Sequence, residues 1–168
     1  MSIAGRIHRV GDHVDTDVII PGRYLTLRDQ AVLGTHCLEG LDPGFAARIA
    51  AGDILVAGRN FGCGSSREHA VLALRGAGIA AVVAESAARI FFRNAINLAL
   101  PVIVAPEAAR ALAEGERAEI DIAAGVIWQG GRSWRFPPFQ GEVAAIIAAG
   151  GLAARVRVIL PDSGPAGG

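Results

Sequence analysis

The residues with the clearest chemical potential lie in one short stretch, between positions 58 and 70. The stretch contains three glycines, two adjacent serines and an arginine: Gly58, Gly62, Gly64, Ser65, Ser66 and Arg67. The apolar run 53–57 before it predicts a short buried strand. The glycines end this strand and permit backbone turns that other residues resist.

Ser65 and Glu68 form a Ser-x-x-Glu sequence, which predicts a capping box at the start of a helix over about 66–75. The free N–H groups and the positive dipole end of such a helix attract anions. The helix dipole disfavours a cation at Arg67, so an arginine at this position needs another reason. Bidentate binding of a carboxylate or phosphate would be such a reason. These residues therefore predict an anion site. The alternative, that Ser65 only caps the helix and the glycines only turn the chain, stays open on this evidence.

Strands and helices are expected to alternate after this stretch, which indicates parallel βαβ units. The pattern predicts a strand over 79–83, a helix capped by Ser86 and running to 95, a strand over 101–105 and a helix from Pro106. Three short apolar runs follow and predict a hairpin or meander over 118–122, 126–128 and 132–136, with a turn at 130–131. A last helix is expected over 138–149, and the region 28–49 is expected to be helical in pieces.

The length of 168 residues predicts one domain, over 1–160, followed by a Pro/Gly/Ser-rich flexible tail over 161–168. The formal net charge is zero, which argues against a nucleic-acid partner. No apolar run reaches the roughly 18 residues of a membrane span, and the N-terminus lacks a signal-peptide core. We therefore expect a cytoplasmic protein with no membrane contact.

Two residue types limit the chemistry. All 16 basic residues are arginine, so a Walker A lysine and a Schiff-base lysine are excluded. The only cysteines are Cys37 and Cys63, and an iron–sulfur cluster needs at least three thiolates from one chain. The four histidines show no metal-ligand spacing, so we expect no metal on this chain.

The uninterrupted run 60–70, Asn-Phe-Gly-Cys-Gly-Ser-Ser-Arg-Glu-His-Ala, resembles the signature of the small subunits of 3-isopropylmalate dehydratases. These are separate-chain versions of the swivelling domain of aconitase. Residues 15–21 with Tyr24-Leu25, and residues 90–97, support the resemblance, which covers about residues 5–152. It implies a single α/β domain of the aconitase swivelling type, with three layers in the order β/β/α.

The resemblance also implies roles for individual residues. Ser65 would be the catalytic base, acting as an alkoxide, while Ser66 and Arg67 would bind a substrate carboxylate. The loop formed by Tyr24, Leu25, Thr26 and Leu27 would contact the variable side of the substrate, with Arg23 and Arg28 flanking it and able to reach in. The alternative, that Tyr24 and Leu25 only pack, stays open. Four further residues are expected close to the site: Asp15, Asp17, Asn60 and Gly64. On turn chemistry alone, the segment 11–17 predicts an Asx-rich loop that caps the next element.

In the resembling enzymes a [4Fe–4S] cluster is held by a separate large subunit, so we expect such a partner and no cofactor on this chain. The substrate would be a small dicarboxylate. A relative that acts on homoaconitate carries an arginine where this chain has Thr26, and an uncharged loop suits a branched alkyl group better. Isopropylmalate is therefore favoured over homoaconitate, citramalate and dimethylmalate.

The sequence argues against several other functional classes. A dinucleotide-binding fingerprint is one such class: Gly62 and Gly64 follow a predicted strand, and Glu85 ends the next strand, where an acid that binds ribose would lie. However, Arg67 stands where this fingerprint has its third glycine. The Gly-x-Ser-x-Gly sequence of serine hydrolases is absent, and Cys63 has no triad pattern around it. A non-catalytic module that binds a dicarboxylate is the remaining alternative, and the intact Ser65 and Arg67 argue against it.

Overall fold

The computed structural model describes residues 1–160, and the predicted tail over 161–168 lies outside them. A seven-stranded sheet has the order β4-β3-β2-β1-β5-β6-β7. Its strands are β1 (Ser2–Arg9), β2 (Ile54–Ala57), β3 (Ala81–Ala84), β4 (Val102–Val104), β5 (Arg117–Asp121), β6 (Val126–Gln129) and β7 (Arg132–Arg135). The helices are α1 (Thr16–Ile19), η1 (Gly22–Tyr24), α2 (Gln30–Thr35), η2 (Ala46–Arg48), α3 (Glu68–Ala77), α4 (Arg89–Asn97), α5 (Pro106–Ala111), α6 (Gly141–Ala149) and α7 (Leu152–Ile159).

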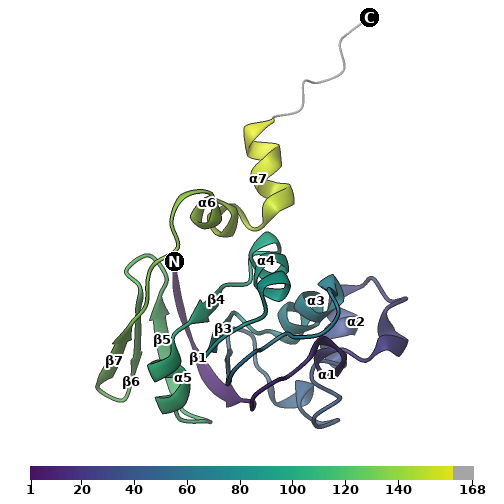
Figure 1. The fold of residues 1–168 in the computed structure, drawn as a ribbon, viewed down its shortest axis with the longest axis horizontal. Helices are drawn as coiled ribbons and strands as arrows, with labels where there is room; N and C mark the ends of the chain where they lie inside the picture. Colours follow the sequence, from purple (N-terminus) through teal and green to yellow (C-terminus); the bar gives the residue numbers. More distant parts are fainter. Residues whose placement is uncertain (161–168) are drawn as a thin grey trace, which may run out of the picture.

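Strand β1 joins a parallel half of the sheet to an antiparallel half. Residues 7–9 of β1 pair with β2 in parallel, whereas residues 2–6 pair with β5 in antiparallel. Strands β3 and β4 extend the parallel half, and β6 and β7 complete the meander on the other side. Figure 1 shows the meander on the left and helices α1, α2 and α3 on the right. The predicted βαβ units and the predicted meander are thus confirmed.

Two hydrophobic clusters lie on opposite faces of the parallel strands. Alternate residues of β2 enter different clusters: Leu55 faces the helices α1–α4, and Ile54 and Val56 face the meander and α5. All four residues of β2 and of β3 are buried, as expected for strands covered on both faces. The curled sheet therefore forms two layers and the helices form a third, which confirms the β/β/α arrangement.

Helices α2 and α3 approach each other through their backbones. A Cβ atom at Gly34 would lie 2.2 Å from the carbonyl carbon of Gly76, and one at Gly76 would lie 1.9 Å from the carbonyl oxygen of Gln30. No side chain fits between the helices at this crossing. This close packing fixes the helical layer against which the stretch 58–70 is placed.

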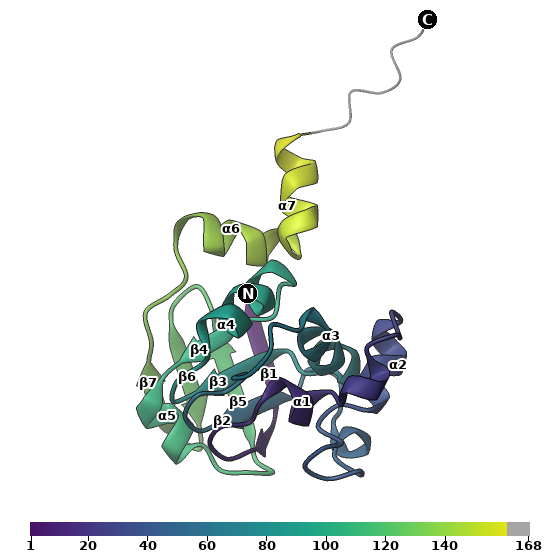
Figure 2. The same ribbon diagram turned by 45° about the vertical axis from the view of Figure 1, so that its right-hand side comes forward.

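The C-terminal part differs from the prediction. The helix expected over 138–149 begins at Gly141, and α7 follows it without having been predicted. Gly150 and Gly151 both have positive φ, so they end α6 as the sequence indicates, but the chain resumes a helix directly afterwards. Figures 1 and 2 show α6 above α4 and α7 pointing away from the sheet. Within residues 1–160, no helix has the length and apolar character needed to cross a membrane.

A buried ion pair joins β1 to the start of β2. The carboxylate of Asp53, only 5% exposed, lies 2.7 Å from Nε2 of His8 and accepts hydrogen bonds from the backbone N–H groups of Ala50 and Arg6. Burial by itself would raise the pKa of Asp53. The hydrogen bonds from His8, Ala50 and Arg6 outweigh it, so the pKa is lowered.

Because the folded-state pKa of Asp53 lies below that of the unfolded chain, ionised Asp53 stabilises the fold above about pH 4. This contribution is lost as the pH falls through the lowered pKa. We expect Asp53→Asn to cost about 1–3 kcal/mol of unfolding free energy at pH 7 and to flatten the acid limb of a plot of Tm against pH. The control is Asp42→Asn: the N–H of Gly44 and the guanidinium of Arg48 also lower the pKa of Asp42, but this aspartate is exposed, so its loss should cost less than that of Asp53. An Asp53→Asn variant with an unchanged acid limb would contradict this assignment.

Candidate active site

A cavity of about 220 Å³ opens where the loop before α3 meets the first turns of α4. Both serines and the arginine predicted from the sequence line it. The full lining is Thr16, Gly62, Gly64, Ser65, Ser66, Arg67, Ala88, Arg89, Ile90, Phe91 and Asn94. The structure therefore brings Gly64, Ser65, Ser66 and Arg67 together at one cavity.

The start of α1 holds the loop in place. The backbone N–H of Gly62 donates to the carbonyl of Val14 (2.8 Å), and the N–H of Thr16 donates to the carbonyl of Cys63 (2.9 Å). The hydroxyl of Thr16 donates to the carbonyl of Ser65 (3.0 Å). These bonds hold the turns of residues 62–65 beside α1, and the serine side chains lie at the cavity.

Gly62 is required at its position for two reasons. Its φ of +77° is a conformation that L side chains rarely adopt, and a Cβ atom there would lie 2.2 Å from Cγ of Phe91. Phe91 in turn packs edge-on against the fully buried Phe61, with ring centroids 5.1 Å apart. This contact fixes α4, and with it the far wall of the cavity, against the loop.

The predicted capping box is wrong. Helix α3 begins at Glu68, and its N-cap residue is Arg67 in an extended conformation, with no side-chain capping bond. The carbonyl of Ser65 is held by the hydroxyl of Thr16, and Arg67 is extended (φ −124°, ψ 110°), so the helical conformation starts only at Glu68. As a result the side chains of Ser65 and Ser66 are exposed at the cavity, and Oγ of Ser66 lies 3.5 Å from Nδ2 of Asn94.

Unpaired backbone donors accompany these hydroxyls. Among residues 1–160, no partner accepts a hydrogen bond from the backbone N–H of Ser65 or Ser66. They lie just before the N-terminus of α3, where the helix dipole favours negative charge. The site can therefore stabilise an anion, including an ionised serine hydroxyl.

Arg67 forms an ion pair with Asp17, which lies in the first turn of α1. The arginine side chain is 21% exposed and the aspartate side chain 63% exposed, so the pair reaches from the cavity to the surface. A second arginine, Arg89 at the start of α4, is also among the lining residues. Two arginines thus border a space that has room for a small anion.

Two of the residues expected near the site have structural contacts. Asp15 is the N-cap of α1 and accepts from the N–H of Val18 (2.9 Å), which confirms the predicted capping role of the segment 11–17. The backbone N–H of Asn60 donates to Oγ of Ser86 (2.8 Å). Ser86 therefore does not cap α4 as predicted; the N-cap of that helix is Ala88.

The loop of Tyr24, Leu25, Thr26 and Leu27 does not line the cavity, because Tyr24 is held by Glu39 on the side of α2. Sequence reasoning missed Thr16, Arg89 and Asn94. Asn94 belongs to the segment 90–97, whose resemblance to the family could have indicated it. Thr16 lies between two aspartates that drew attention away from it, and Arg89 is part of no recognised motif.

The described residues do not fit a metal or an iron–sulfur cluster. No group of three or more His, Cys, Asp or Glu side chains among them could hold a metal ion. Cys37 is buried, and burial raises the pKa of its thiol to about 12, so it is a neutral core residue. Cys63 is a free cysteine in the loop.

Ser65, Ser66 and Arg67 lie within residues 41–107, which match the family model of the aconitase C-terminal domain. The small subunit of 3-isopropylmalate dehydratase from Moorella thermoacetica is 51% identical over 154 residues, covering 90% of this chain and 93% of the relative. The chain therefore belongs to the family of 3-isopropylmalate dehydratase small subunits.

Two further relatives are informative. The crystal structure of 3-isopropylmalate dehydratase from Methanocaldococcus jannaschii superimposes with a TM-score of 0.90 at 44% identity, covering 95% of each chain. The small subunit of 2,3-dimethylmalate dehydratase from Eubacterium barkeri is 47% identical, covering 90% of this chain and 94% of the relative. The family thus includes relatives named for two different substrates.

Proposed function

We propose that this chain is the small subunit of a heteromeric hydro-lyase that interconverts 2-isopropylmalate and 3-isopropylmalate by dehydration and rehydration, as in leucine biosynthesis. The observation that carries this proposal is the cavity in which Ser65, Ser66, Arg67 and Arg89 meet before α3. The two arginines that line it could each bind one of the two carboxylates of a malate-type acid. We place the assembled enzyme in the cytoplasm and assign residues 1–160 to one domain.

In this proposal Ser65 removes the proton from the carbon next to a substrate carboxylate. A serine hydroxyl is a weak base, so its alkoxide needs stabilisation by the free N–H groups of the loop and by the dipole of α3. Arg67 binds a substrate carboxylate in bidentate fashion, and Ser66 donates to the same group. Asn94 orients Ser66 through the contact between Nδ2 and Oγ. Rehydration returns the proton from Ser65 to the neighbouring carbon.

Residues 1–160 contain no group of donors that could hold the Lewis acid needed to assist departure of the hydroxide. We propose that a large subunit holds a [4Fe–4S] cluster and supplies this chemistry. The cavity on the small subunit would then face that partner, and neither subunit would be active alone.

Isopropylmalate is the proposed substrate, and 2,3-dimethylmalate is the second candidate because one relative with 47% identity bears that name. Leu25, Thr26 and Leu27 lie outside the cavity, and we propose that they contact the variable part of the substrate in the assembled enzyme. Their uncharged side chains suit an alkyl group better than a third carboxylate. Homoaconitate, which carries an additional carboxylate, is therefore disfavoured.

The test is reconstitution. The isolated full-length chain should show no iron–sulfur absorbance after treatment with iron and sulfide and no dehydratase activity. The same chain mixed with a cluster-bearing large subunit should convert 2-isopropylmalate to 3-isopropylmalate. A stoichiometric cluster on the isolated chain, or a complex inactive on every malate-type acid, would refute the proposal.

A further inference from the structure

One buried hydroxyl group, that of Thr16, is bonded to the backbone of the proposed base. It donates to the carbonyl oxygen of Ser65 at 3.0 Å, and the backbone N–H of the same threonine donates to the carbonyl of Cys63 at 2.9 Å. Thr16 is only 2% exposed, and it lines the cavity. A single residue of α1 therefore holds two carbonyls of the loop that carries both serines.

The hydroxyl of Thr16 is not needed to build α1. Thr16 is the first residue of that helix, and the helix is capped by Asp15, whose carboxylate accepts from the N–H of Val18 at 2.9 Å. The proton of the Thr16 hydroxyl is used for the bond to the loop. Loss of this hydroxyl therefore removes support from the loop and leaves the cap of α1 in place.

The two bonds from Thr16 fix the direction of two peptide groups. All peptide bonds in residues 1–160 are trans, and in a trans peptide the C=O and the following N–H point in opposite directions. The carbonyls of Cys63 and Ser65 are directed at Thr16. The N–H groups that follow them, those of Gly64 and Ser66, therefore point away from it. Neither N–H group has an acceptor within residues 1–160, and both residues line the cavity.

The peptide between Ser65 and Ser66 is exposed, so packing does not select one orientation for it. The preceding Gly64, with a φ of +95°, belongs to the residue type that permits the widest range of backbone conformations. The contact of Ser66 with Asn94, at 3.5 Å, is at the long end of the hydrogen-bond range. The shorter bond from Thr16 is therefore the contact that fixes this peptide.

We propose that Thr16 is a positioning residue for proton removal: by holding the carbonyl of Ser65, its hydroxyl directs the side chain of the base and the N–H of Ser66 toward the substrate. This inference rests on the proposed function. Arg67 is held separately, at the start of α3 and by Asp17, so binding of a carboxylate does not depend on this bond. Loss of the bond should lower kcat more than it raises KM, since proton transfer is sensitive to displacements of about 1 Å.

The experiment uses the complex reconstituted with its large subunit and compares the wild type with Thr16→Val, which keeps the shape of the side chain and removes the donor. We expect kcat for 2-isopropylmalate to fall about 10- to 100-fold and KM to stay within about threefold. Exchange of the substrate carbon-bound hydrogen with solvent deuterium should slow in parallel with kcat. Thr16→Ser, which restores the hydroxyl, should bring kcat back to within about threefold of the wild type.

The matched control is Thr35→Val. It breaks another bond from a threonine hydroxyl to a backbone carbonyl, that of Val32 at 2.6 Å, in α2 and outside the cavity. Both kcat and KM should stay within about twofold of the wild type.

Several results would overturn this inference and leave the proposed function intact. A near-normal kcat in Thr16→Val would mean that the bond is not needed for proton removal. A rise in KM as large as the fall in kcat, without recovery in Thr16→Ser, would mean that Thr16 only maintains the fold. Should Thr16→Val fail to assemble, Thr16→Ala takes its place, and failure of both would assign the hydroxyl to folding. A wild-type complex inactive on every malate-type acid would overturn the proposed function and this inference with it.

Discussion

Replacing Ser65 with alanine is expected to lower kcat of the reconstituted enzyme by about a thousandfold or more, because a positioned general base contributes about 10²–10⁴ and no other described group shares its place. Assembly should persist, since the Ser65 side chain is exposed and makes no hydrogen bond within residues 1–160. The measurement is steady-state kcat together with exchange of the substrate carbon-bound hydrogen with solvent deuterium. Both should fall together.

The matched control for this variant is Ser133→Ala, which removes an exposed hydroxyl from β7, away from the cavity. It should retain kcat within about twofold. Ser66→Ala should raise KM and leave the exchange reaction measurable, because Ser66 is proposed to bind a carboxylate and not to move the proton. A Ser65→Ala enzyme with near-normal kcat would remove Ser65 as the base.

The sheet was predictable because local patterns determine it. The buried strand Ile54–Ala57 is a short apolar run ended by Gly58, the strand Ala81–Ala84 lies in an apolar run between Gly78 and Glu85, and the meander has a glycine turn at 130–131. These features depend on neighbouring residues, so periodicity and turn chemistry are sufficient to find them.

The detailed geometry of the site was less predictable because it depends on contacts between distant segments. The capping box failed because Thr16, 49 positions away, holds the carbonyl of Ser65 and delays the start of α3. The ion pair of Arg67 with Asp17 and the contribution of Arg89 arise in the same way. The residue types at 65–67 were enough to predict an anion site. The residues that contact them come from distant parts of the sequence, so they could be identified only from the fold.

Conservative replacement of Arg67 by lysine is expected to raise KM for 2-isopropylmalate by about 10- to 100-fold, because lysine cannot offer the paired N–H donors that grip a carboxylate. The expected change in kcat is smaller, since Ser65 and its surroundings are retained. Asp17 already occupies the guanidinium of Arg67, so a substrate carboxylate has to compete with it. Because the Asp17 side chain is 63% exposed, this ion pair contributes at most about 1 kcal/mol and can be exchanged at low cost.

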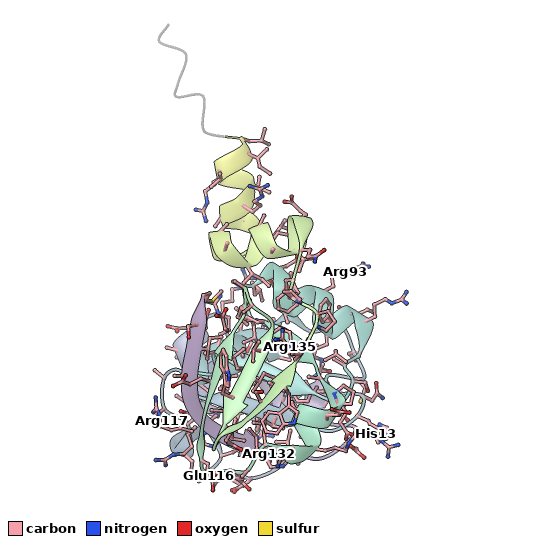
Figure 3. The ribbon with its side chains drawn as sticks, turned by 90° about the vertical axis from the view of Figure 1, so that its left-hand side faces the viewer. His13, Arg93, Glu116, Arg117, Arg132 and Arg135 are labelled. Atoms are coloured by element: carbon pink, nitrogen blue, oxygen red, sulfur yellow. The ribbon has the colours of Figure 1, made fainter. Side chains whose placement is uncertain are left out.

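The control for the arginine variant is Arg132→Lys on the meander, where Figure 3 shows Arg132 near the lower end of the strands that face the viewer. Arg132 stacks on Trp134 and does not line the cavity, so KM should stay within about twofold of the wild type.

Competition with Asp17 gives a second test of this role of Arg67. Asp17→Asn should leave the Arg67 guanidinium available and lower KM, which is the opposite of the effect of Arg67→Lys. Equal KM values for Arg67→Lys and the wild type would mean that this guanidinium does not hold the substrate. An unchanged KM in Asp17→Asn alone would mean that the substrate carboxylate and Asp17 bind Arg67 through different N–H groups.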